Sequence, residues 1–238
     1  MARSKRSRHV TEEFAIVFAL YPGITQLDFT GPYEVLARLP GARAILASTR
    51  GGTIEAGGGM TFSEVVRLAD VEHCALLCVP GGLGTIDALE DLEYLTQIRR
   101  LAERARYITS VCTGSLLLGA AGLLRGKRAA CHWAWRDLLP IFGAVPDAGR
   151  VVREGNLITG GGVTAGIDMA LTVVGEIAGA GLAKVVQLSI EYAPAPPFDA
   201  GTPEAAAPEI VALARRRFDG ARQRSEEAAR RAASRCTW

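Results

Sequence analysis

The sequence has 238 residues, of which 49% are hydrophobic and 22% are charged, and its net charge is +2. These values are normal for a soluble globular protein, and the length suffices for one large α/β domain or two small ones. No apolar run approaches the roughly 20 residues that span a bilayer, so we expect no membrane partner.

Six segments have the apolar, β-branched composition of strands, and helical patterns lie between them. The expected strands are Phe14–Leu20, Ala44–Ser48, Ala75–Val79, Arg106–Val111, Arg128–Cys131 and Leu157–Thr159. The expected helices are Pro32–Leu39, Leu92–Ala105, Thr113–Leu124, Trp135–Phe142, Thr164–Ala178 and Leu182–Tyr192. Glycines at 51–52 and 57–59 bound an expected hairpin. This alternation predicts a single α/β domain, with a mostly parallel sheet flanked by helices on both faces.

The two ends of the chain differ from its middle. Residues 1–13 form a basic tail, residues 14–198 carry the α/β pattern, and residues 199–238 form a C-terminal helical extension with an Arg-rich tail. A helix expected over Pro208–Phe218 either folds back on the domain or packs on a second subunit. The residues from 219 onward are either a frayed helix or disordered. No module of helix-turn-helix size remains outside the core, so we expect solvated tails and no nucleic-acid partner.

The cysteines exclude one class of architecture and single out one residue. Their number is odd, their spacing is irregular and no Cys-x-x-Cys occurs, which argues against a disulfide framework or a zinc site and for a reducing cytoplasm. Cys112 differs from the others because it lies where the strand Arg106–Val111 turns into a helix. A helix N-terminus favours thiolate over thiol. We therefore expect an exposed, ionisable sulfur at Cys112 and a nucleophilic role.

Two glycine-rich loops follow strands of the predicted sheet. In Pro80-Gly81-Gly82, a glycine N–H could serve in an oxyanion hole beside Cys112, although a tight turn with no other duty is compatible with the same residues. The second loop, 160–163, opens a long helix after Leu157–Thr159. Neither loop has the spacing of a dinucleotide or phosphate fingerprint, so the second is expected to shape a small pocket.

Asp28 and His132 are the titratable groups most relevant to Cys112. Asp28 follows the first strand and precedes the helix expected at Pro32, where Thr30 would be the better N-cap. If Asp28 points into the pocket, it could exchange protons with Cys112 or with a substrate, and burial beside a thiolate would raise its pKa. His132 follows the strand Arg128–Cys131. A Cys–His dyad would need it, because Thr113 rather than a histidine follows Cys112, but a structural hydrogen bond is the more usual role for such a histidine.

Together, these segments resemble the ThiJ/PfpI superfamily, whose members share the flavodoxin-like fold of class I glutamine amidotransferases. The resemblance covers about residues 14–198. It is carried by the Asp28 segment, Pro80-Gly81-Gly82, Ser110-Val111-Cys112-Thr113-Gly114-Ser115, His132-Trp133 and residues 160–168. The similarity to the isocyanide hydratase branch extends through Val186-Gln187-Leu188 and 191–198.

The resemblance implies an enzyme that hydrates an isocyanide to an N-formamide. Cys112 then matches the nucleophile and Asp28 the acidic partner that acts as general acid/base. Thr113, Gly161 and Val163 match pocket positions, and Gly82 is expected to bind substrate with them. No metal or cofactor is implied, and the hydratases are homodimers. Apolar walls are expected from Ile24, Phe29, Leu83 and Trp133.

Two other readings stay open. The superfamily's proteases and glyoxalases commonly have His after the nucleophile, and Thr113 departs from that pattern. A second branch forms the ligand-sensing half of AraC-type regulators, and we expect this chain to lack their DNA-binding domain. A third reading is another Cys-dependent hydrolase or a redox sensor, in which Cys112 would oxidise readily.

Overall fold

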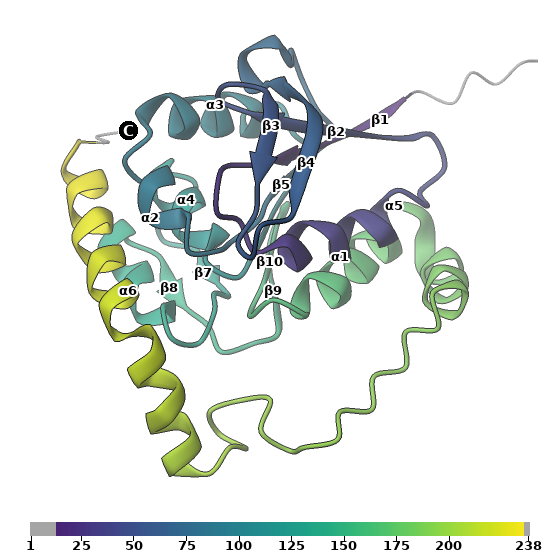
Figure 1. The fold of residues 1–238 in the computed structure, drawn as a ribbon. Coiled ribbons are helices and arrows are strands. Elements are labelled where there is room, and N and C mark those ends of the chain that lie inside the picture. Colours follow the sequence, from purple (N-terminus) through teal and green to yellow (C-terminus); the bar gives the residue numbers. More distant parts are fainter. Residues whose placement is uncertain (1–12, 236–238) are drawn as a thin grey trace, which may run out of the picture.

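A computed structural model describes residues 13–235 of the chain, so the basic start up to residue 12 and Cys236 lie outside it (Figure 1). One eight-stranded sheet forms its centre, in the order β3-β4-β2-β1-β5-β6-β10-β9. Its strands are β1 (Phe14–Ala19), β2 (Ala42–Ser48), β3 (Gly52–Glu55), β4 (Thr61–Arg67), β5 (Leu76–Val79), β6 (Tyr107–Val111), β9 (Val151–Glu154) and β10 (Leu157–Gly160). Six adjacent strands are parallel, and only the two edge strands, β3 and β9, are antiparallel to their neighbours.

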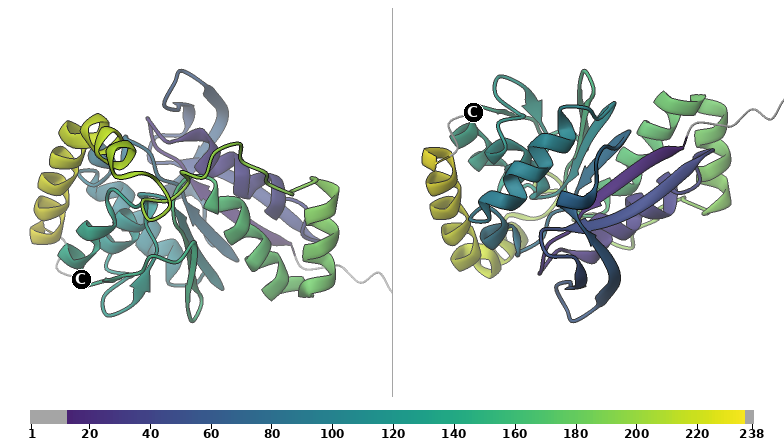
Figure 2. Two further views of the ribbon diagram at one scale, coloured as in Figure 1. Left: turned by 90° about the horizontal axis from the view of Figure 1, so that it is seen from below. Right: turned by 90° about the horizontal axis from the view of Figure 1, so that it is seen from above.

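The central strands β5 and β6 are buried along their whole length because both faces of the sheet are covered. The helices are α1 (Gln26–Leu36), α2 (Thr85–Ala88), α3 (Leu92–Ala102), α4 (Gly114–Ala120), α5 (Ala165–Ser189) and α6 (Pro208–Arg235), with short 3₁₀ helices η1 (Leu68–Asp70) and η2 (Arg136–Phe142). Helices α1 and α5 pack on one face, and α3 and α4 on the other (Figure 2). The α/β class and the flanked, mostly parallel sheet are confirmed.

One hairpin prediction is confirmed, and one strand prediction is wrong. The hairpin expected between the glycine pairs is present as β3 and β4. The strand expected over Arg128–Cys131 is wrong as a member of the main sheet. Only Arg128–Ala129 is extended, and this strand, β7, pairs with β8 (Val145–Pro146) in a separate two-stranded sheet.

Helix α1 begins at Gln26, so the prediction of a helix from Pro32 is wrong at its start. Pro32 lies inside the helix, where it has no N–H to donate to the carbonyl of Asp28. This break in the hydrogen-bond ladder is accommodated because Gly31 and Pro32 press closely on Gly166 and Ile167 of α5. As a result, Asp28 lies in the first turn of a helix rather than in a loop.

Helix α5 is long and apolar enough, by length and composition alone, to cross a membrane, which corrects the expectation that no such run exists. Its backbone breaks at Gly179, which has a left-handed φ of 85° and a ψ of 157°. The segment before the break packs on α1 and buries Met169, Val173 and Val174, as the core helix of a globular domain does. The two helices expected on either side of the break are therefore both present.

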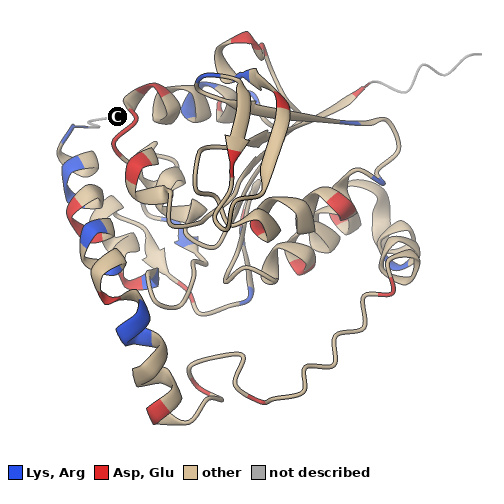
Figure 3. Cartoon of the chain, in the orientation of Figure 1, with Lys and Arg blue, Asp and Glu red and all other residues tan. Residues whose placement is uncertain are grey.

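Helix α6 extends to Arg235, well beyond the expected end at Phe218, and it folds back on its own chain. It packs against α2, α4 and η2 and forms an outer layer along one side of the molecule (Figure 1). Ser225, Ala228, Ala229 and Ala232 are buried in this contact. Charged residues spread along its length (Figure 3), and Arg231 and Arg235 pair with Glu90.

Candidate functional site

Cys112 lies in the tight turn between β6 and α4, as the sequence predicts. Its φ is +59°, a conformation that costs an ordinary L-residue about 1–2 kcal/mol. The backbone N–H of Cys112 compensates by donating to the carbonyls of Gly160 (3.1 Å) and Gly161 (2.6 Å). The glycine-rich loop after β10 therefore holds the cysteine corner in place from the neighbouring strand.

Asp28 is fully buried and reaches Cys112 from the first turn of α1. Its Oδ2 accepts a hydrogen bond of 3.1 Å from the N–H of Gly81. Its Oδ1 has no hydrogen-bond partner of standard geometry among the described residues, although the carboxyl and the Cys112 thiol interact closely enough to shift each other's pKa. The expected meeting of the acid and the thiol is therefore present.

Gly81 allows Asp28 and Cys112 to come together, because a residue with a side chain would not fit between Asp28 and Thr113. A Cβ at Gly81 would lie 2.5 Å from the N of Thr113 and 2.8 Å from Oδ2 of Asp28. Real Cβ atoms essentially never come so close to other heavy atoms. The glycine thus sets the approach of α1 to the start of α4.

Thr113 ties the cysteine corner to the loop after β5. Its Oγ1 accepts the N–H of Gly82 at 2.9 Å and lies 2.8 Å from Oγ1 of Thr85. Thr85 in turn lies 3.0 Å from the hydroxyl of Tyr21, which donates to the carbonyl of Pro80. The N–H of Gly82 is therefore already satisfied within the protein, and it could serve in an oxyanion hole only by giving up its bond to Thr113.

Burial dominates the electrostatics of the site. It raises the pKa of Asp28 from its ordinary 3.8 to about 7, against smaller lowering effects of the Cys112 thiol and the Gly81 N–H. It also raises the pKa of Cys112 well above 9.0, with the charge of Asp28 as the next cause. Cys112 is only 5% exposed. The expected exposed, readily ionised sulfur is wrong, because desolvation outweighs the helix N-terminus and the Thr113 N–H.

A pocket of about 180 Å³ opens onto Cys112. Its walls are mainly apolar, and they are formed by Thr25, Gly82, Leu83, Thr113, His132, Trp135, Val163, Phe218 and Ser225. A small, mostly apolar hollow with a few polar groups is the usual form of a site for a small organic ligand. The arrangement places the Cys112 thiol in the pocket wall, with the Asp28 carboxyl of raised pKa buried beside that thiol and outside the lining residues.

His132 lies in the pocket wall with its imidazole packed among aromatic rings. Its Nδ1 accepts the N–H of Ala134 at 3.2 Å, and its ring contacts those of Trp135 and Phe218 edge-on. Burial lowers its pKa from 6.5 to about 4, so the ring is neutral at physiological pH. These contacts agree with the structural hydrogen bond expected from the sequence.

The other sequence-predicted positions divide between the pocket and its surroundings. Val163, Leu83, Gly82 and Thr113 line the pocket. Gly161 instead supports the cysteine corner and lines a neighbouring hollow of about 280 Å³. The expected walls that lie elsewhere are Ile24 and Phe29, buried in the core, and Trp133, which borders other hollows.

Sequence reasoning missed Trp135 and two residues of α6, Phe218 and Ser225. Trp135 donates its indole N–H to Oγ of Ser225 at 3.0 Å, which joins α6 to the pocket wall. A usable signal was present in the small residues at 221, 225, 228, 229 and 232, which recur at helical spacing. Within residues 13–235, no cluster of three or more His, Cys, Asp or Glu residues could hold a metal ion.

Comparison with known proteins agrees with this geometry. Residues 15–176 match the DJ-1/PfpI family. The chain is 52% identical to the isonitrile hydratase of Pseudomonas putida, over 85% of this chain and 89% of that protein. It is 29% identical to the HTH-type transcriptional regulator CdhR of Pseudomonas aeruginosa, over 74% of this chain but only 53% of the regulator. The crystal structure of a ThiJ/PfpI family protein from Pseudomonas syringae superposes with a TM-score of 0.88 at 35% identity, covering 96% of this chain and 97% of that one.

Proposed function

The chain belongs to the DJ-1/PfpI family, and we propose that it is an isocyanide hydratase that converts R–N≡C and water into the N-formamide R–NH–CHO. The observation that carries the proposal is the pairing of the Cys112 thiol with the buried Asp28 carboxyl beside a small apolar pocket. Its likeness to a named isonitrile hydratase over most of both chains supports the same reaction.

The first step adds the S–H of Cys112 across the isocyanide carbon. The sulfur attacks that carbon and forms a C–S bond, while Asp28 takes the thiol proton and delivers a proton to the same carbon. The product is a thioimidate, R–N=CH–S–Cys112. Splitting the hydration in this way replaces one slow step by two easier ones.

Water then adds to the thioimidate carbon and breaks the covalent link. Asp28, left as a carboxylate, accepts one proton from the water and delivers it to the thioimidate nitrogen, which becomes the amide N–H. The tetrahedral intermediate R–NH–CH(OH)–S–Cys112 then collapses: the C–S bond breaks, the hydroxyl oxygen forms the formyl C=O, and the hydroxyl proton passes through Asp28 to the departing sulfur. No atom changes its oxidation state overall, because the reaction only adds the elements of water.

The raised pKa values determine which protonation state of the pair is productive. Below pH 7 the pair holds two protons, one on Asp28 and one on Cys112. Above about pH 7 it holds one, and transfer of that proton from sulfur to Asp28 supplies the nucleophile and the acid together. We therefore expect kcat/KM to rise through about pH 7 as the pair loses its second proton.

Replacement of Cys112 and Asp28 tests the assignment. Cys112→Ala should form no formamide from phenyl isocyanide, and Asp28→Asn should lose at least ~100-fold in kcat, the range of general acid–base catalysis. Cys74→Ala is the matched control, since Cys74 is a buried free thiol outside the pocket. Formamide release by Cys112→Ala at the wild-type rate would remove the cysteine from the reaction.

We also propose that the protein is a homodimer and that it is located in the cytoplasm. Leu188 (81% exposed), Val185 and Phe198 leave apolar surface uncovered on the end of α5 and on the segment that follows it. A second copy of the chain would cover such a surface. Sedimentation of the wild-type protein and of Leu188→Arg tests this, with a dimer that dissociates in the variant as the expected result.

The likeness to CdhR keeps a ligand-sensing role as a second candidate. A sensor would bind an isocyanide-sized ligand in the Cys112 pocket without releasing formamide. A redox-sensing role has less support, because the burial that raises the pKa of Cys112 keeps the sulfur in the less oxidisable thiol form. Turnover of phenyl isocyanide separates the enzyme from both.

A further inference from the structure

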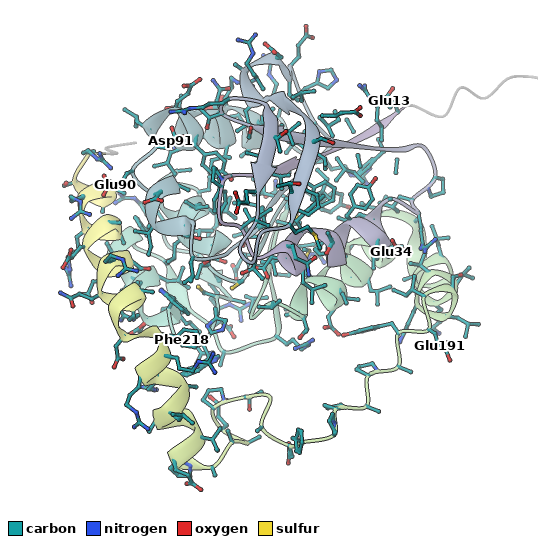
Figure 4. The ribbon with its side chains drawn as sticks, in the orientation of Figure 1. Glu13, Glu34, Glu90, Asp91, Glu191 and Phe218 are labelled. Atoms are coloured by element: carbon teal, nitrogen blue, oxygen red, sulfur yellow. The ribbon has the colours of Figure 1, made fainter. Side chains whose placement is uncertain are left out.

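Helix α6 supplies part of the wall of the Cys112 pocket. Phe218 and Ser225 come from this helix, whereas all other wall residues belong to the α/β domain. The ring of Phe218 packs at a tilt against Trp135 with centroids 5.0 Å apart and edge-on against His132 at 5.7 Å. Figure 4 shows Phe218 on the side of α6 that faces the domain.

Phe218 also borders a second, larger hollow on the surface. This groove of about 550 Å³ is lined by polar and charged residues, among them Arg136, Arg215 and Arg222. Among residues 13–235, Phe218 alone lines both this groove and the Cys112 pocket. Its ring is therefore the wall between a small apolar hollow and a wide polar one.

The attachment of α6 differs on the two sides of Phe218. Toward the C-terminus, the helix is held by the Trp135–Ser225 hydrogen bond, the Arg222–Asp137 ion pair and the buried alanines. Toward the N-terminus, the helix follows a largely exposed segment, and Ile210 and Leu213 remain about half exposed. The ring thus sits at the margin of the firmly docked part.

We propose that Phe218 sets the size limit of the isocyanide side chain R. With the reacting carbon at Cys112, R extends into the pocket toward Leu83, Val163 and the Phe218 ring. A group larger than the pocket that extends in this direction presses on that ring and has to displace it toward the polar groove. The choice of isocyanides as the substrates rests on the proposed hydratase activity, whereas the role of the Phe218 ring as a barrier does not.

Substrate series measure the size limit directly. For Phe218→Ala, the kcat/KM for 2-naphthyl isocyanide relative to methyl isocyanide should rise at least tenfold over wild type. Leu213→Ala is the matched control on the same helix and should leave the ratio within twofold. Phe218→Trp should lower the ratio at least fivefold. Ratios unchanged in both Phe218 variants would overturn the proposal.

Alkylation of Cys112 tests the barrier without any assumption about turnover. Peptide mapping follows the modification of Cys112 by iodoacetamide and by the much larger N-(1-pyrenyl)maleimide at pH 8.5, with melting curves to confirm folding. Phe218→Ala should accelerate the large reagent at least tenfold more than the small one. If wild-type protein hydrates no isocyanide but this selective acceleration is observed, the proposed function fails and the barrier stands. Equal acceleration of both reagents would overturn the barrier itself.

Discussion

The burial of Asp28 should make the stability of the protein depend on pH in a way that Asp28→Asn removes. An aspartate whose pKa is 3.8 when unfolded and about 7 when folded binds its proton more tightly in the folded state. Stability is therefore highest when the group is protonated in both states, and it falls as the pH rises from about 4 to about 7. At about 1.4 kcal/mol for each unit of pKa, the loss is about 4 kcal/mol.

Urea denaturation of both proteins between pH 4 and pH 8.5 provides the measurement. The free energy of unfolding of wild type minus that of Asp28→Asn should fall by about 4 kcal/mol between pH 4 and pH 7 and stay level above pH 8. Taking the difference between the two proteins cancels the titration of groups they share, such as His132. A difference that is flat across this range, or that rises with pH, would refute the argument that desolvation controls Asp28.

Three further substitutions test other parts of the structure. Gly81→Ala should lower the formamide-forming kcat/KM at least ~100-fold by separating Asp28 from Thr113, as misplaced catalytic groups do, whereas Gly175→Ala, which has ample space, should not. Ala229→Leu should lower the free energy of unfolding by about 1–3 kcal/mol through overpacking under α6, and Ala212→Leu, at an exposed position, should not. Equal urea midpoints for the two variants would contradict the contact between the buried alanines of α6 and the domain. Glu90→Gln should cost less than about 1 kcal/mol, since its ion pairs are partly exposed and screened by salt; a larger loss would mean that they anchor α6.

The cysteine corner was predictable because its determinants are local. The apolar run Tyr107–Val111, the cysteine and the small residues Gly114 and Ser115 define a strand, a turn and a helix within ten residues. The pairing of Asp28 with Cys112 was anticipated from a family resemblance, since nothing local to Asp28 indicates its partner. The start of α1 was missed for a related reason. Pro32 gives a local signal for a helix start, and the contact of this segment with α5, which is distant in the sequence, overrides it.

The sign of the Cys112 pKa shift could not be read from the sequence. The position before a helix favours the thiolate, and that part of the argument is local. The opposing cost of desolvation depends on Trp135, Phe218 and Ser225, which enclose the pocket from distant parts of the chain. The docked continuation of α6 beyond Phe218 escaped prediction because alanine and serine give a weak periodic signal, although their small size is what lets the helix approach closely.

The long exposed segment before α6 turns the docking of this helix into a binding equilibrium within one molecule. A flexible tether of this kind holds its two ends at an effective concentration of about a millimolar. Contacts that would be too weak between separate chains can then keep the thiol enclosed. A protease cut in residues 193–207 would leave the Cys112 thiol and the Asp28 carboxyl in place. It would, however, lower the concentration of α6 at its docking site from the effective value to that of the protein in solution.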